Sequence, residues 1–202
     1  RESKLQMLRY QLTPHFLSNT LNAINSLIEV QANEKAQKMT VQLSRFLRYS
    51  LDNNPVTRLP LENEMNAIQL YLDIEKTRFG ERLNLDFQIS EKANRALVPS
   101  LLIQPIIENS MKHVIARNEE GGTISLTADI ENEQLVLALS DTGITASPVN
   151  RRQRTRNPTS QNRSIGLSNI DERLKALYDS DYSFEIFTLS SGALKTMIKI
   201  PY

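Results

Sequence analysis

The sequence has no cysteine and only two histidines among its 202 residues. The absence of cysteine excludes a disulfide scaffold, a thiolate nucleophile and cysteine metal ligands, and it fits a reducing compartment such as the cytoplasm. The chain has no Ser-His-Asp set and no histidine-rich metal spacing, so most hydrolase and zinc mechanisms lack the residues they need. It also has neither a phosphate loop of the Gly-x-x-x-x-Gly-Lys kind nor a dinucleotide fingerprint.

Charge and hydropathy point neither to a nucleic acid nor to a bilayer. The 24 Lys and Arg residues nearly cancel the 23 Asp and Glu residues, so no overall field favours DNA, RNA or an anionic membrane surface. No apolar run approaches the ~18 residues of a membrane span, and there is no signal peptide. The chain opens at Arg1 in a pattern that is already helical. We therefore expect a cytoplasmic fragment whose parent protein continues N-terminally through a membrane or sensor region.

Two amphipathic segments at the start of the chain predict an antiparallel helical hairpin. In the first, a helix of roughly 30 residues, apolar residues recur in steps of mostly three and four. They are Leu5, Leu8, Leu12, Leu17, Leu21, Ile24 and Ile28. The second stripe consists of Ala36, Met39, Leu43, Phe46 or Leu47, and Leu51. So narrow a hairpin cannot bury both stripes alone, so we expect a homodimer that forms a four-helix bundle, with packing onto the rest of the same chain as the alternative.

The remainder of the chain has the pattern of an α+β domain. Two prolines and two asparagines within 52–60 indicate a linker, which divides the chain into domains 1–60 and 61–202. The periods of the apolar residues predict helices at 61–79, 101–115 and 165–178, and strands at 83–89, 123–130, 134–140, 184–189 and 194–200. We expect a mixed sheet of about five strands that helices cover on one face. Residues 141–164 have no periodicity.

One histidine, His15, lies beside a proline within a segment of helical periodicity. A proline inside a helix costs about 3 kcal/mol. Either Thr13 caps a new helix with Pro14 in its first turn, or one long helix bends here and turns His15 outward. An imidazole is nucleophilic without strong activation, which makes His15 the candidate for the chemistry.

The predicted helix 101–115 carries four polar residues close together: Glu108, Asn109, Lys112 and His113. An amide oxygen suits Mg²⁺, which keeps most of its waters and takes few protein ligands plus substrate phosphates. The ammonium of Lys112 suits a phosphate. From spacing alone, an ordinary amphipathic edge with a Glu-Lys pair is the alternative.

The ends of the aperiodic segment have features that suit a nucleotide. Asp141 follows a strand, where its carboxylate can accept a hydrogen bond from a ligand amine, and Gly143 allows close backbone approach. At the far end, 164–167 opens a helix whose free N–H groups favour an anion. Alone, these are a turn and a helix start. The arginines between them either close over a polyphosphate or belong to a solvated loop; they are Arg151, Arg152, Arg154, Arg156 and Arg163.

Taken in order, these pieces resemble the LytS-like family of sensor histidine kinases. The phosphoacceptor motif of that family, close to Asn-Pro-His-Phe-Leu-Phe-Asn-x-Leu-Asn, stands here as Thr-Pro-His-Phe-Leu-Ser-Asn-Thr-Leu-Asn at 13–22. The resemblance continues in the blocks 74–83, 104–113, 141–143 and 166–174 and covers essentially the whole chain.

This resemblance implies a dimerisation and phosphotransfer hairpin, followed by an ATP-binding domain of the GHKL or Bergerat type, an α/β sandwich with a mobile lid. His15 would take the γ-phosphate of ATP and pass it to an aspartate on the receiver domain of a response regulator. Asn19 would orient the imidazole or position a water for dephosphorylation, with packing on the helix surface as its alternative role.

The resemblance also implies a set of nucleotide-binding residues. Asn109 would hold Mg²⁺, with Glu108 and Lys112 beside the phosphates, and Asp141 would recognise the adenine amine. Gly143 and Gly166 would flank the lid. The full expected set is Glu108, Asn109, Lys112, His113, Asp141, Gly143, Gly166 and Leu167.

The sequence departs from the family pattern at several positions. Thr145 and Ser164 replace glycines that flank the lid, Ser18 replaces a usual phenylalanine and Thr13 the usual asparagine. A Cβ atom where the backbone must approach a phosphate lowers affinity or hinders the lid. A competing prediction is therefore a degenerate, non-catalytic signalling module that dimerises with impaired ATP binding. A GHKL ATPase of another kind would not need the Pro14-His15 motif.

Overall fold

The first two helices of the computed structural model, which describes residues 14–52, 57–142, 165–189 and 192–202, form an antiparallel hairpin. Helix α2 spans Pro14–Glu29 and α3 spans Asn33–Asp52. Their antiparallel pairing brings Phe16, near the start of α2, to Phe46, near the end of α3, with ring centroids 5.4 Å apart. In the tight turn between them, Ala32 N donates to Leu27 O at 2.8 Å. The predicted hairpin is thus confirmed.

The two helices bury different parts of their predicted stripes. The stripe of α3 is buried as far as Phe46. On α2 the buried residues are Phe16 and Thr20, one position before Leu17 and Leu21 of the predicted stripe. Leu21 is 52% exposed and Ile28 is 54% exposed. The predicted stripe of α2 therefore lies beside the face that packs within this chain, and its first members, up to residue 12, lie outside the described residues.

A five-stranded mixed sheet forms the other side of the molecule, with strand order β2-β4-β5-β7-β6. The strands are β2 Leu83–Ile89, β4 Gly122–Glu131, β5 Gln134–Asp141, β6 Ser183–Thr188 and β7 Leu194–Pro201. Strand β2 runs parallel to β4, and the other pairs are antiparallel. Alternate residues face the core: on β4, Ile124 and Leu126 are buried while Thr127 and Asp129 are exposed.

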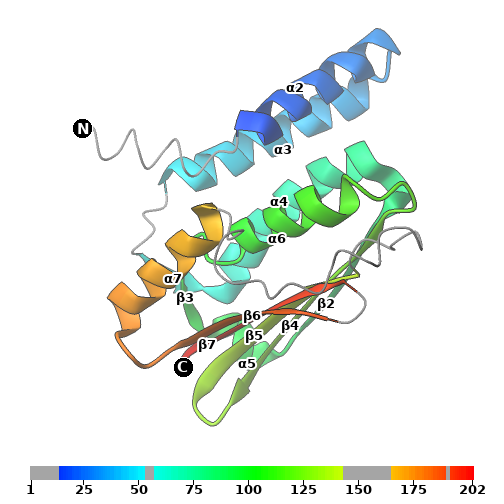
Figure 1. The fold of residues 1–202 in the computed structure, drawn as a ribbon. Helices are drawn as coiled ribbons and strands as arrows, with labels where there is room; N and C mark the ends of the chain where they lie inside the picture. Colours follow the sequence, from blue (N-terminus) through cyan, green and yellow to red (C-terminus); the bar gives the residue numbers. More distant parts are fainter. Residues whose placement is uncertain (1–13, 53–56, 143–164, 190–191) are drawn as a thin grey trace.

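Helices cover one face of this sheet, and the hairpin lies over them (Figure 1). The covering helices are α4 Leu61–Phe79, α6 Gln104–Ser110 and α7 Ile165–Tyr178. Tyr71 of α4 contacts both aromatic rings of the hairpin, with centroids 4.8 Å from Phe16 and 5.8 Å from Phe46. The hairpin and the α/β half consequently share one continuous hydrophobic core. The division into 1–60 and 61–202 stays a prediction.

Four short elements were not predicted. Strands β1 Arg58–Pro60 and β3 Leu97–Pro99 form a separate two-stranded antiparallel sheet. Helix α5, Glu91–Arg95, begins at Ser90, whose hydroxyl accepts a hydrogen bond from Ala93 N. A single 3₁₀ turn, η1 Gly80–Arg82, joins α4 to β2.

The observed helix differs at both ends from the helix predicted over 101–115. The helix starts at Gln104 and not at Leu101, and Pro99 is the last residue of β3. After Ser110 the chain continues as a π-helical turn, η2 Met111–Ile115, in which Ala116 N donates to Met111 O at 2.9 Å. The wider turn buries two consecutive apolar residues, Val114 and Ile115. Such π turns are frequent at functional sites.

Candidate functional site

His15 lies in the first turn of α2 with its imidazole exposed, while the next residue, Phe16, is buried. Pro14 is the first residue of α2, a position where proline is tolerated because its missing N–H has no partner in the helix. Thr13 lies outside the described residues, so the cap and the bent helix both stay open. Packing of Phe16 therefore fixes the helix while the imidazole of His15 faces outward.

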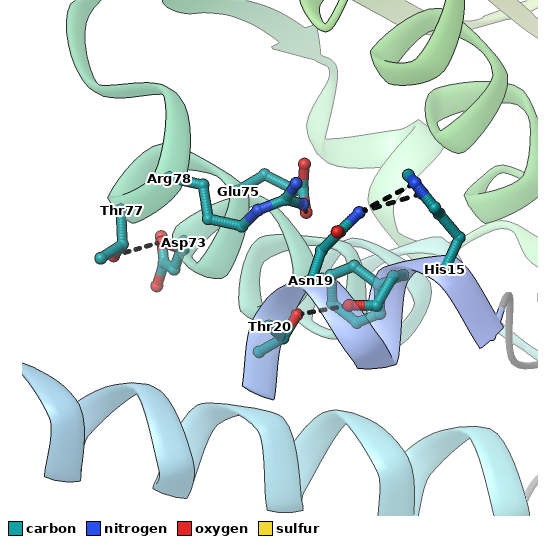
Figure 2. Close-up of polar contacts among 8 residues, drawn as sticks. His15, Asn19, Thr20, Asp73, Glu75, Thr77 and Arg78 are labelled. Carbon is teal, nitrogen blue, oxygen red and sulfur yellow. Dashed lines mark hydrogen bonds and ion pairs between the residues drawn. The ribbon is translucent and has the colours of Figure 1, made fainter. Parts of the chain in front are cut away.

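Asn19 lies one helical turn after His15 and its side chain reaches the imidazole (Figure 2). The Nδ2 atom of Asn19 is 3.0 Å from Nδ1 and 3.2 Å from Nε2 of His15. One amide nitrogen therefore lies within hydrogen-bond distance of both ring nitrogens. The next residue, Thr20, is buried and its hydroxyl donates to Phe16 O at 2.8 Å, which ties the turn together.

Two carboxyl groups on the helices next to the hairpin are shielded from solvent, Glu75 fully and Glu108 in part. Glu75 on α4 is 3% exposed, and Arg78 Nη1 donates to its Oε1 at 2.6 Å (Figure 2). Burial raises the pKa of Glu75, and the charge of Arg78 lowers it in part. On α6, burial raises the pKa of Glu108 to about 7; a hydrogen bond from Gln104 lowers this pKa, and the charge of Glu75 raises it.

Glu108 makes its described contact along its own helix and not with Lys112. Gln104 Nε2 donates to Glu108 Oε1 at 2.8 Å. Among the described residues, no ion pair joins Glu108 to Lys112, whose side chain is exposed on η2. The Glu-Lys pair of the alternative interpretation is therefore not formed among the described residues, while the amphipathic edge itself stays an open alternative.

The candidate nucleotide residues of α6 and β5 are brought together by one hydrogen bond. Ser110, next to the half-buried Asn109, donates through Oγ to Asp141 Oδ2 at 3.1 Å. Leu194 N donates to the other oxygen, Oδ1, at 3.1 Å. The carboxylate of Asp141 is thus held in a fixed orientation at the end of β5, beside the helix that carries Asn109.

The remaining predicted residues are partly described. Leu167 is buried in the core on α7, and Gly166 precedes it as the second residue of that helix. Gly143, the substituted positions Thr145 and Ser164, and the side chain of His113 lie outside the described residues. The same holds for the loop arginines, Arg151, Arg152, Arg154, Arg156 and Arg163.

The donor groups fit a Mg²⁺ ion that is held together with a nucleotide. No group of three or more His, Cys, Asp or Glu side chains in the described part of the chain can hold a metal ion by itself. An amide oxygen at Asn109 is a hard ligand, and Mg²⁺ commonly takes one or two protein ligands, several waters and substrate phosphates. A carboxylate oxygen such as those of Asp141 is a hydrogen-bond acceptor, which is the kind of group that an amine N–H of a nucleotide base needs.

One residue that shapes the site carries no periodic signal in the sequence. Arg82, in η1, donates through Nη2 to Ile115 O at 3.1 Å and to Asn118 O at 2.6 Å, and so holds the end of η2. Close contact here also explains Gly121, which has φ +78° and whose added Cβ atom would lie 2.0 Å from Arg82 O. The signal that the sequence offers for Arg82 is its position in block 74–83, one of the blocks that resemble the family.

None of the helices in the described part of the chain has the length and apolarity that a membrane crossing needs.

Comparisons with known proteins agree with the order of these motifs. A family model described as histidine kinase matches residues 3–83. The sensor protein LytS of Staphylococcus saprophyticus is 30% identical over 204 residues, which are 100% of this chain and 34% of that protein. The sensor histidine kinase YpdA of Escherichia coli is 33% identical over 179 residues, which are 88% of this chain and 31% of that protein. The chain thus spans about a third of the length of these relatives.

Solved structures share the fold at low sequence identity. The catalytic domain of the histidine kinase ThkA superposes with a TM-score of 0.52 at 10% identity, over 72% of this chain and 95% of that domain. A structure described as a bacterial phosphotransferase gives a TM-score of 0.54 at 14% identity, over 97% and 95% of the two chains. The predicted α+β fold of the GHKL type is confirmed. With relatives that match over its whole length, the chain belongs to the LytS-like family of sensor histidine kinases.

Proposed function

We propose that this chain is the kinase core of a two-component sensor, which phosphorylates its own His15 from ATP and passes the phosphoryl group to an aspartate on a response-regulator receiver domain. The observation that carries this proposal is the exposure of the His15 ring beside the buried Phe16. A histidine that served only packing would be expected inside the core, whereas this ring is open to a second domain.

Transfer of the γ-phosphoryl group from ATP to a histidine requires mainly that the imidazole is correctly positioned. An unprotonated ring nitrogen attacks the γ-phosphorus, an N–P bond forms, and the P–O bond to ADP breaks. A 180° rotation of the Asn19 amide exchanges Nδ2 for Oδ1 beside the ring, so that the amide accepts the imidazole N–H. The other ring nitrogen then keeps its lone pair for the attack, and the acceptor stabilises the positive charge that develops on the ring.

The nucleotide would lie against α6 and the end of β5. Asp141, held by Ser110 and by Leu194 N, accepts the adenine amine. Lys112 is exposed on η2 and lies within the same helical stretch as Asn109, so its ammonium suits the phosphates. A bound Mg²⁺, held through Asn109, would neutralise phosphate charge.

A second copy of the chain would cover the outer apolar face of the hairpin. Leu21, Ile28 and Leu51 are each more than half exposed. A groove of about 400 Å³ on α3 is lined by Leu43, Leu47 and Leu51, among others. Large apolar side chains that gather on one side of a two-helix unit favour association into a four-helix bundle. We infer a homodimer through this face.

Incubation with γ-labelled ATP and Mg²⁺ tests the proposal. We expect acid-labile, alkali-stable label on the wild-type chain, no label on His15→Gln, and normal label on Ser18→Ala, a matched change at an exposed neighbour. Transfer is then followed by adding a receiver domain and measuring loss of label from the kinase. A wild-type chain that incorporates no label would refute the kinase assignment.

Calorimetry separates the kinase from the non-catalytic module. A chain that binds Mg-ATP, and loses this binding in Asp141→Asn, has a working nucleotide site. A chain that sediments as a dimer but binds no nucleotide would support the degenerate module.

A further inference from the structure

Leu101, in the turn between β3 and α6, has an unusual backbone conformation. Its φ is +58°, in the left-handed region that bulky residues rarely adopt. The side chain is 6% exposed, so the residue is fixed in the core. A conformation of this kind persists only where the surrounding structure holds it in place.

Charged side chains from two other helices hold the peptide groups of this turn. Glu64 of α4, which is 1% exposed, accepts hydrogen bonds from Leu101 N at 2.8 Å and from Ile103 N at 3.1 Å, one at each carboxylate oxygen. Arg173 of α7 donates through Nη2 to Leu101 O at 3.1 Å. Side chains from α4 and α7 thus hold the turn that leads into α6 through hydrogen bonds.

The hairpin reaches the same carboxylate. The hydroxyl of Tyr49, three residues before the end of α3, donates to Glu64 Oε2 at 3.0 Å. This oxygen also accepts Leu101 N. One buried carboxylate therefore joins the hairpin that carries His15 to the turn from which α6, with Asn109, begins.

We propose that Glu64 is a positioning residue, whose carboxylate sets the pose of α6 and makes that pose depend on the docking of Tyr49 from the hairpin. The expected consequence is that docking of the hairpin changes the affinity for a nucleotide at Asn109 and Asp141. Only this consequence rests on the proposed function. A carboxylate suits this role because it accepts all three hydrogen bonds, whereas an amide in its place would turn an N–H group toward one of the donors.

Two variants of the full chain, each with a matched control, test the proposal. Tyr49→Phe removes only the hydroxyl, and Tyr182→Phe is its control because it removes an equivalent bond, of 2.9 Å, to Asp171. Glu64→Gln removes the charge, and Glu62→Gln changes an exposed glutamate on the same helix. The readouts are the backbone amide resonances of Leu101, Ile103 and Asn109, and the Kd for Mg-ATP by calorimetry.

We expect Tyr49→Phe to move all three amide resonances and to raise the Kd about threefold, and Glu64→Gln to raise it roughly tenfold or more, since a bond to a charged group is lost. The controls should match the wild type. Resonances and Kd that stay at wild-type values in Tyr49→Phe would overturn the proposal. If Glu64→Gln does not fold, Tyr49→Phe still decides. If the wild-type chain binds no nucleotide, the proposed function fails, and the amide resonances alone decide the role of Glu64.

Discussion

Replacement of Glu108 by glutamine tests whether the acidic group beside Asn109 is held in a desolvated site. Burial raises the pKa of Glu108 from 4.5 to about 7 in the folded chain. Because the folded state holds this proton more tightly, its contribution to stability is fully present below pH 4.5 and is lost as the pH rises through 7. At about 1.36 kcal/mol for each pH unit, the loss amounts to at most about 3 kcal/mol at pH 8.

Glutamine resembles the protonated carboxyl, so Glu108→Gln should avoid this loss. We expect the free energy of unfolding of the variant to match that of the wild type at pH 4.5, and to exceed it by about 2–3 kcal/mol at pH 8. Urea unfolding at the two pH values, without nucleotide, measures the difference. The hydrogen bond from Gln104 is preserved, since the amide oxygen of glutamine still accepts it.

The comparison between Glu108→Gln and the wild type needs a control, because Glu75 lies near Glu108. Glu75 also has a raised pKa and is close enough to Glu108 to raise the pKa of its neighbour, so both proteins keep some pH dependence and only their difference is informative. Glu62→Gln, at an exposed position on α4, should leave the pH dependence unchanged. A constant difference between Glu108→Gln and the wild type from pH 4.5 to 8 would show that Glu108 is not desolvated.

Further changes test other contacts. Phe16→Ala, which removes a buried ring, should lower the free energy of unfolding in urea by about 3–5 kcal/mol. Gly121→Ala should destabilise by more than Gly80→Ala, by at least about 1 kcal/mol in thermal unfolding, because both glycines have positive φ but only Gly121 meets backbone atoms. Leu51→Asp should give a monomer in sedimentation, with stability within about 0.5 kcal/mol of the wild type. Asn19→Ala should slow phosphorylation of the histidine roughly tenfold or more at unchanged Kd for ATP.

Long periodic segments were predictable from the sequence, and short ones were not. The helix over 61–79 and the strand over 83–89 match α4 and β2 at both ends, because each repeats its apolar residues several times. Strands β1 and β3 have three residues each and α5 has five, too few for a period. The start of α6 was misplaced because Leu101 and Leu102 are apolar and buried but belong to a turn that Glu64 holds.

The motif blocks named the candidate residues, but not the contacts that join them. Ser110 and Asp141 are 31 positions apart, and Glu64 and Leu101 are 37 apart. Such bonds depend on how α6 packs against β5 and α4, which no local pattern encodes. The side of α2 that packs within the chain was ambiguous for a related reason, since apolar residues occupy adjacent positions at Phe16 and Leu17.

The hairpin has two separate apolar faces. Phe16 faces Tyr71 of α4, whereas Leu21 and Leu51 are exposed, so the face that docks on the α/β half and the face that we assign to a second copy are distinct. If a second copy covers the second face as we propose, we expect dimer formation and docking of the hairpin to be independent of each other. Phe16→Ala should then lower stability while the chain still dimerises, and Leu51→Asp should abolish the dimer while stability stays near that of the wild type. Loss of dimerisation in Phe16→Ala, measured by sedimentation under folded conditions, would show that the two faces are not independent.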